Sequence, residues 1–157
     1  HRTVHHRLRY RRRIQPPRFS RWRSDPRVLV EESDGATRES FLRVLEQAGF
    51  EAVGCGGPDE NSGSLCALSG PAGCAAAADA DVVFFSLRLS DPVNQEVLRA
   101  LKRRYPHTPI VVEIPKPKEL AHHDLLIGTH PVYSPITRRT LARSVREAWA
   151  SSVRAAG

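Results

Sequence analysis

The segment 81–86, with the sequence DVVFFS, constrains the fold more than any other part of the chain. Its four central residues are all apolar, so a β-strand built from them has no polar face. Strands of this kind lie inside parallel sheets whose two faces are both covered by helices. The segment therefore predicts a central strand of a covered parallel sheet.

Short β-forming runs and helical patterns alternate along the chain. The expected strands cover 28–30, 51–54, 82–85, 109–114 and 131–134. A helix is predicted after each strand, from the helical spacing of apolar residues or from helix-forming composition. These five helices are expected to end before residue 49, at 78, near 105, at 127 and at 153. The order βαβαβαβαβα with short connections implies right-handed crossovers. The predicted fold class is α/β, a five-stranded parallel doubly wound sheet of flavodoxin-like type with helices on both faces.

The charge of the chain is distributed unevenly. The 24 Lys and Arg exceed the 17 Asp and Glu, giving a formal net charge of +7. Residues 1–27 hold ten Arg and one Asp, so residues 28–157 hold 14 basic and 16 acidic side chains. This distribution excludes a domain over 28–157 that binds nucleic acid through basic charge spread evenly over its surface. No apolar run approaches the roughly 18 residues of a membrane span, so we expect no membrane association.

The Arg-rich segment 1–27 contains three Pro and shows no apolar periodicity, so we expect a disordered tail. One interpretation is an arm that binds nucleic acid through Arg11, Arg12, Arg13 and Trp22. The other interpretations are a solvated tail and sequence that lies upstream of the true start, because the chain contains no Met. The expected organisation is completed by a domain over 28–150 and a flexible C-terminus over 151–157.

An insertion at 55–75 carries all three cysteines, Cys55, Cys66 and Cys74. An odd and low number of Cys argues against a disulfide scaffold and for a reducing, cytoplasmic setting. Three thiolates with one His are ligands that Zn²⁺ accepts, although the spacing C-x10-C-x7-C lacks the usual separation of about two to four residues. A zinc site, a redox site and free thiols stay open as interpretations.

Open parallel α/β sheets place their functional sites outside the carboxyl ends of the strands. The residues that follow the predicted strands are therefore the first candidates for a site. They are residues 31–34, 86–89, 114–116 and 134–136.

Residues 27–150 resemble the receiver domain of two-component response regulators. The resemblance is carried by RVLVEESD at 27–34, Arg38, AGFE at 48–51, DVVFFSLRLSD at 81–91, PIVV at 109–112 and SPI at 134–136. It implies the same receiver-type sheet. It also implies a phosphorylation site in which two acidic residues hold Mg²⁺ and an Asp after the third strand accepts the phosphoryl group. A Thr or Ser after the fourth strand and a Lys after the fifth complete that site.

This sequence departs from the receiver pattern at four of these five positions. The two acidic positions of the pattern align with Glu32 and Ser33, and Asp34 is adjacent. The acceptor position aligns with Ser86, the Thr position with Ile114 and the Lys position with Ser134. The resemblance therefore indicates a degenerate, or pseudo-receiver, domain in which Mg²⁺ is not expected. With a Ser at the acceptor position, the sequence also resembles the degenerate receivers of antiterminator-type regulators.

We expect a non-phosphorylatable signalling module that binds a protein partner in two-component or phosphorelay regulation, and not an enzyme. The resemblance places a partner surface, and a homodimer contact, within 119–150. Its residues are Arg138, Arg139, Leu141, Arg143, Val145 and Arg146, and the arginines fit a solvated face equally well. The alternative is a nucleic-acid-associated regulator whose tail binds DNA or RNA and whose receiver fold supplies dimerisation.

Overall fold

The computed structural model describes residues 25–58, 66, 68 and 70–156. Its strands are β1 (Arg27–Glu31), β2 (Glu51–Cys55), β3 (Val82–Phe85), β4 (Ile110–Ile114) and β5 (His130–Tyr133). They form one sheet in the order β2-β1-β3-β4-β5, and every neighbouring pair is parallel. The predicted fold class, a five-stranded parallel doubly wound sheet, is confirmed.

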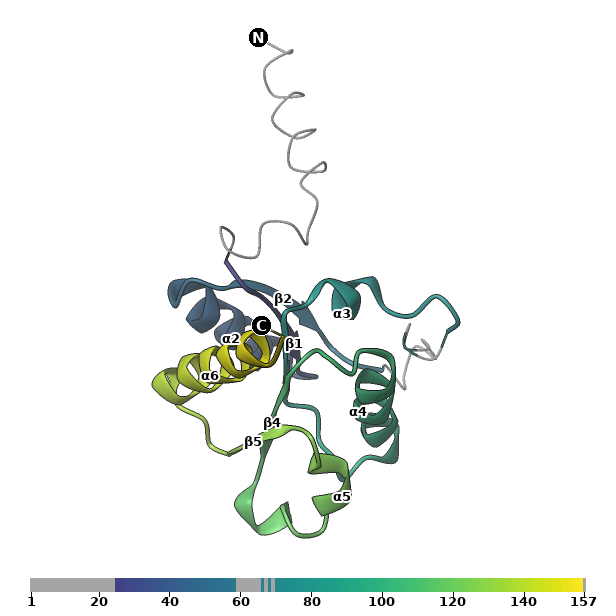
Figure 1. Ribbon diagram of the computed structural model, residues 1–157. Helices are drawn as coiled ribbons and strands as arrows, with labels where there is room; N and C mark the ends of the chain where they lie inside the picture. The colour runs from purple at the N-terminus through teal and green to yellow at the C-terminus, as the bar shows by residue number, and fades with distance from the viewer. Residues whose placement is uncertain (1–24, 59–65, 67, 69, 157) are drawn as a thin grey trace.

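Helices cover both faces of this sheet (Figure 1). They are α2 (Gly35–Gln47), α3 (Ala75–Asp79), α4 (Pro92–Arg104), α5 (His123–Leu126) and α6 (Arg138–Ala156), with a 3₁₀ turn, η2, at Lys116–Lys118. The helices α2 and α6 lie on one face, and α3, α4 and α5 lie on the other. The carboxyl ends of the strands therefore form one open edge between two helical layers.

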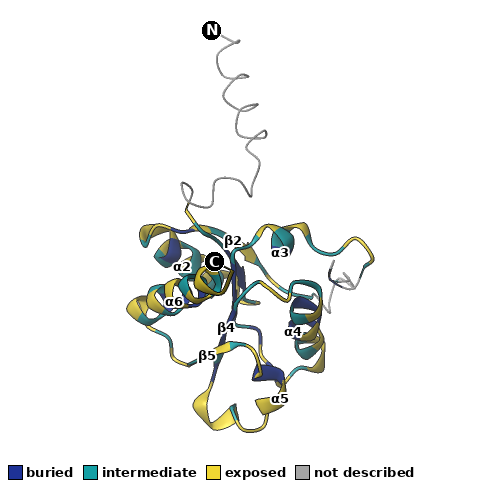
Figure 2. Ribbon diagram, in the orientation of Figure 1, coloured by how far each residue is buried: buried dark blue, intermediate teal, exposed yellow. Residues whose placement is uncertain are grey.

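The central strand β3 is buried along its whole length, as its apolar sequence predicts. Side chains alternate between the two faces of a strand, so Val82 and Phe84 pack toward α2 and α6 while Val83 and Phe85 pack toward α3, α4 and α5. Figure 2 shows the buried residues concentrated in the strands and on the inner sides of the helices. The two hydrophobic clusters fix the position of each helix on its face.

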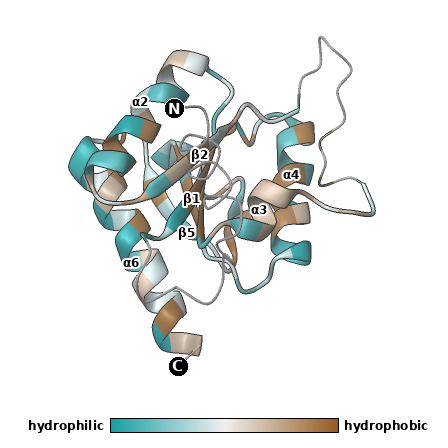
Figure 3. Ribbon diagram, turned by 90° about the horizontal axis from the view of Figure 1, so that it is seen from above, coloured by the Kyte–Doolittle hydropathy of each residue, from teal (hydrophilic) through white to brown (hydrophobic). Residues whose placement is uncertain are grey.

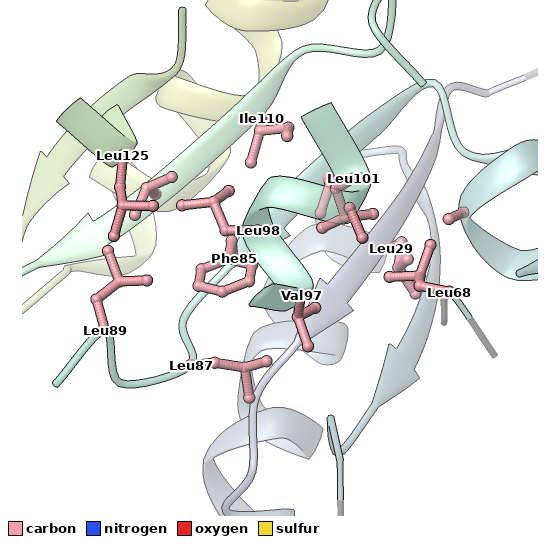
Figure 4. Packing of buried hydrophobic residues seen from close by; sticks show 14 of the residues in the cluster. Leu29, Leu68, Phe85, Leu87, Leu89, Val97, Leu98, Leu101, Ile110 and Leu125 are labelled. Carbon is pink, nitrogen blue, oxygen red and sulfur yellow. The ribbon is translucent and has the colours of Figure 1, made fainter. Parts of the chain in front are cut away.

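The cluster on the α4 face is built around the ring of Phe85 (Figure 4). Val97, Leu98 and Leu101 of α4 reach it at helical spacing, and Leu125 of α5 closes one side. Seen from above, hydrophobic residues follow the strands and hydrophilic residues lie on the outer surface of α2 and α6 (Figure 3). None of the helices in the described part of the chain is long and apolar enough to span a membrane.

The N-terminal boundary of the domain lies slightly earlier than expected. Arg27, assigned to the tail by its sequence, is the first residue of β1. Its backbone N–H donates to Asp81 at 2.8 Å, and its guanidinium pairs with Glu51 at 3.2 Å. Most of the expected disordered tail, residues 1–24 with the nucleic-acid residues Arg11, Arg12, Arg13 and Trp22, lies outside the described residues.

The C-terminal helix is longer than the sequence predicted. We expected a flexible segment over 151–157, but α6 continues through Ala156. Ala and Arg are strong helix formers, and they occupy the last positions of the helix. The Ser152 hydroxyl also lies 3.4 Å from the carbonyl oxygen of His107 and donates to it. These features explain why the helix does not end near Val153.

Candidate functional site

Three side chains at or just beyond the ends of β1, β3 and β4 meet at the carboxyl edge of the sheet. The Ser86 hydroxyl donates to Oε1 of Glu113 at 2.6 Å and lies 3.5 Å from Oε1 of Glu32. The Ser86 backbone N–H donates to the carbonyl oxygen of Glu31 at 2.8 Å, which fixes the turn after β3. We call Glu32, Ser86 and Glu113 the Ser86 site.

The alternation of side chains explains why these three residues meet. Val30, Phe84 and Val111 lie side by side in neighbouring strands and belong to the cluster under α2 and α6. Residues two positions further along each strand point to the same face, and they are Glu32, Ser86 and Glu113. The Ser86 site thus continues, with polar side chains, the row of apolar side chains that Val30, Phe84 and Val111 form on the same face of the sheet.

Sequence reasoning missed Glu113 and placed Ile114 at the site instead. The side chain of Ile114 is 2% exposed and lies in the hydrophobic cluster on the α4 face. The signal that identifies Glu113 is its distance of two residues from Val111, which pairs with Phe84. The expectation for Ile114 is therefore corrected, because position 114 faces the core and position 113 faces the site.

Asp34, considered as a neighbour of the missing second acid, acts as the N-cap of α2. Its carboxylate accepts from the Thr37 hydroxyl at 2.6 Å and from the Thr37 backbone N–H at 2.9 Å. These two hydrogen bonds hold the pKa of Asp34 below its usual range. Ser33 is exposed. Neither residue shares a hydrogen bond with Ser86, and only the Asp34 backbone N–H reaches Glu32, at 3.3 Å.

Ser134, at the position expected for a Lys, is exposed and carries no charge. Its backbone N–H donates to the carbonyl oxygen of Ile114 at 3.0 Å, and the Ser134–Pro135 peptide bond is cis. Among the described residues, neither Glu32 nor Glu113 forms an ion pair. The Ser86 site therefore combines two carboxyl groups and one hydroxyl, with no ion pair to offset the acidic charge.

The basic groups near this edge have other partners. Arg38 of α2 donates to the backbone carbonyl of Glu32 at 2.7 Å, so it fixes the end of β1 rather than the carboxylate. Lys116 lies over the ring of Tyr133, 5.5 Å from its centre. A hydrogen bond to Glu119 raises the pKa of the Tyr133 phenol.

The three cysteines are the predicted ligands of a zinc site. Within 25–58, 66, 68 and 70–156, no group of three or more His, Cys, Asp and Glu side chains is arranged to hold a metal ion. Cys55, Cys66 and Cys74 are free thiols, each partly buried. Zinc binding by the cysteines stays a prediction.

The expected partner surface on α6 divides into buried and exposed residues. Leu141 and Val145 are 1% and 0% exposed and pack in the cluster under α6, so they are not available to a partner. Arg138, Arg139 and Arg143 are exposed. The proposed surface is corrected accordingly, since the two apolar residues belong to the core.

Arg146 is exposed as well, but its guanidinium contacts the end of α2. It donates to the carbonyl oxygen of Ala48 at 2.9 Å, and its guanidinium lies 5.4 Å from the centre of the Phe50 ring. Cations are favourable at the C-terminal end of a helix, and Ala48 is the C-cap of α2. Arg146 therefore connects α6 to α2 and is not part of a free arginine surface.

Replacing Arg146 by Ala is expected to lower the free energy of unfolding by about 1 kcal/mol, through loss of the cation–π contact and the helix-end hydrogen bond. Arg143→Ala is the matched control, because Arg143 is exposed on the same helix. Urea unfolding of the two variants compares them directly. Equal stability of both variants would contradict the connecting role of Arg146.

A groove of about 700 Å³ lies at the opposite edge of the sheet, where β3, β4 and β5 begin. Asp81, His107, His130 and Trp149 are among its lining residues, and none of the three residues of the Ser86 site lines it. The groove is therefore separate from the carboxyl edge.

No protein-family model matches this chain, and no curated protein matches its sequence. Solved structures do match its fold. A CheY-like response regulator receiver domain from Methanospirillum hungatei JF-1 has a TM-score of 0.63 at 16% identity, covering 84% of this chain and 99% of its own. A receiver domain from Clostridium thermocellum has a TM-score of 0.63 at 16% identity, covering 83% and 98%. The chemotaxis protein CheY4 of Vibrio cholerae has a TM-score of 0.57 at 17% identity, covering 80% and 99%.

These matches extend over almost the whole length of the three receiver structures. Their sequence identities are low, so the likeness concerns the fold. The protein has the fold of response regulator receiver domains, with Ser86 at the carboxyl end of the central strand.

Proposed function

We propose that this domain is a receiver-like signalling module that takes up no phosphoryl group and acts by binding a protein partner. Its setting would be two-component or phosphorelay regulation in the cytoplasm. The observation that carries the proposal is the Ser86 hydroxyl, which donates to Glu113 and lies beside Glu32. A hydroxyl cannot form the acyl phosphate that a carboxylate acceptor forms.

The charge of the Ser86 site supports the same proposal. Phosphoryl transfer depends on cations that neutralise the charge on the transferred group. Here an incoming phosphoryl group would meet the carboxyl groups of Glu32 and Glu113, and Ser134 contributes no positive charge. The electrostatic environment therefore opposes binding of a phosphoryl donor.

The same groups argue against an enzyme that uses Ser86 as a nucleophile. Glu113 lies within reach as a base, but catalysis by a hydroxyl also requires donors directed at the developing oxyanion. The side chains that contact the Ser86 hydroxyl are two carboxyl groups, which repel an oxyanion. We therefore propose a binding function without catalysis.

The proposed partner surface consists of Arg138, Arg139 and Arg143 at the start of α6, with Tyr133 on the edge strand β5. All four residues are exposed. Exposed arginines suit a partner with acidic residues, and exposed aromatic rings are common in protein interfaces. A homodimer through the region 119–150 stays a prediction.

Incubation of the protein with acetyl phosphate and Mg²⁺ is expected to leave its intact mass unchanged. Mass spectrometry at neutral pH measures this directly, and a phosphorylatable receiver domain treated in parallel verifies the reagents. Addition of one phosphoryl group would contradict the proposal. Asp34→Asn would then show whether Asp34 is the acceptor, because loss of the adduct in this variant would assign it.

A further inference from the structure

The groove at the amino edge of the sheet, of about 700 Å³, contains no residue of the Ser86 site or of the proposed partner surface. Its volume lies in the range of sites that hold a small ligand or a few side chains. One wall is the C-terminal half of α6, within 148–156. The other walls are the end of α3 with the residues before β3, 78–81, and the segment between α4 and β4, 104–109. The groove is therefore a binding site that the proposed function leaves unused.

The electrostatics of this groove favour a cation. With histidine counted as neutral, its lining holds two acidic side chains, Asp79 and Asp81, and one basic side chain, Arg104. Arg104 is directed toward the loop before α3, because a Cβ atom built on Gly73 would lie 2.6 Å from its Nη1 atom. The helices α4 and α6 both end at residues of the lining, and the carbonyl groups at a helix C-terminus carry partial negative charge. The charge of the groove is therefore negative.

Trp149 adds an aromatic surface to the same groove. Its side chain is partly buried and packs against the cluster under α6, which holds the indole in place. A guanidinium group stacks on aromatic rings and pairs with carboxylates through parallel N–H donors, whereas an ammonium group is a compact point charge. A groove that combines Asp79, Asp81 and Trp149 therefore suits arginine side chains in particular.

The chain itself enters the domain beside this groove. The Arg27 N–H donates to Oδ2 of Asp81, and the Asp81 N–H donates to the Arg27 carbonyl oxygen, both at 2.8 Å. The first residue of β1 thus contacts a residue of the groove lining. Residues 1–24 lie outside the described part of the chain, and their sequence contains nine Arg and no Asp or Glu. Arg23 precedes Arg27 by four residues, a separation that an extended chain spans over up to about 14 Å.

We propose that the groove binds arginine side chains from residues 1–24 of the same chain. Attachment at Arg27 makes this binding intramolecular, with an effective concentration in the millimolar range, so that even a weak contact is occupied. The bound arginines lie against Asp79 and Asp81 and cover Trp149. This inference does not depend on the proposed signalling function, because the Ser86 site and the partner surface lie outside the groove.

The first test measures how far these arginines cover Trp149. The full chain contains two tryptophans, so Trp22→Phe leaves Trp149 as the single fluorophore. Quenching of its fluorescence by acrylamide then reports the accessibility of the indole. Replacing the nine arginines of 1–24 by Gln is expected to raise the quenching constant roughly twofold, because tethered arginines occupy the groove most of the time. An equal quenching constant with and without these arginines would overturn the inference.

Two controls separate this contact from general effects of charge. Gln at Arg138, Arg139 and Arg143, which are exposed and lie outside the groove, is expected to leave the quenching constant unchanged. The protection of Trp149 is also expected to be independent of protein concentration, because the groove and the arginines belong to one chain. Protection that grows with protein concentration would assign the arginines to a second copy and would overturn intramolecular binding.

The second test changes the groove in the same Trp22→Phe chain. Asp79→Lys places a cation at the exposed last residue of α3 and is expected to raise the quenching constant of Trp149 as much as loss of the arginines does. Asp124→Lys is the matched control, because Asp124 is exposed on α5 outside the groove. In the chain that lacks the nine arginines, Asp79→Lys is expected to add nothing further. No rise with Asp79→Lys, or the same rise with and without the arginines, would overturn the inference.

Discussion

Replacement of Glu31 by Leu is expected to raise the free energy of unfolding at pH 8 by about 3 kcal/mol. Glu31 is 2% exposed, and burial raises its pKa from 4.5 to about 7. At pH 8 the folded protein must therefore hold a buried carboxylate that the unfolded chain exposes to water. Leu has a similar volume and carries no charge, so it removes this cost.

The direction of the pH dependence follows from the two protonation states. Between pH 4.5 and 7 the folded protein keeps a proton on Glu31 that the unfolded chain has lost. The stability that this proton provides is complete below pH 4.5 and is lost as pH rises through 7. Glu31→Gln keeps the shape of the side chain and is expected to remove this part of the pH dependence.

Urea unfolding of the reduced proteins from pH 4.5 to 8 measures both effects. Glu39→Gln is the control, because Glu39 is exposed on α2 and should change the curve little. The difference between wild type and the Glu31 variants cancels the titration of the groups that do not interact with Glu31. A wild type that is no less stable than Glu31→Leu at pH 8 would contradict the burial of a charged Glu31.

The variant Ser86→Asp is expected to be less stable than wild type by about 2 kcal/mol at pH 7.5. The new carboxylate would occupy the position from which the Ser86 hydroxyl contacts Glu113 at 2.6 Å and Glu32 at 3.5 Å. Three carboxyl groups at these distances repel one another, so one of them keeps its proton to a higher pH than in the unfolded chain. The stability loss should therefore be smaller at pH 5.

Ser86→Asn is the matched control, because it has the size of Asp without the charge. Urea unfolding at pH 5 and pH 7.5 is expected to show a pH-dependent loss only for the Asp variant. Equal losses for Asp and Asn at both values of pH would show that size, and not charge, decides the effect.

The fold could be predicted because its determinants are local and repeated. The apolar run of β3 indicates burial on both faces, and short connections between strands and helices leave one arrangement of parallel crossovers. The end of α6 was harder to predict. Its last residues are helix formers that also have contacts with the segment before β4, such as the bond from Ser152 to His107.

The candidate site was predicted less completely, for two different reasons. Glu113 was missed because Ile114 follows the pattern of the resemblance, whereas the register of β4 against β3 decides which residue faces Ser86. Glu31 was missed as a buried group because Glu is almost never fully buried without a partner. Its proximity to Cys55 depends on the pairing of β1 with β2, which the sequence alone does not specify.

We propose that the whole environment of the Ser86 site, and not only its acceptor residue, prevents phosphoryl transfer. The most direct test is the intact mass of Ser86→Asp after incubation with acetyl phosphate and Mg²⁺, measured beside wild type. We predict no phosphoryl adduct on either protein, because Glu113 and Glu32 repel the donor and Ser134 supplies no charge. A phosphorylated Ser86→Asp protein would contradict the claim, since a single substitution would then suffice to restore the site.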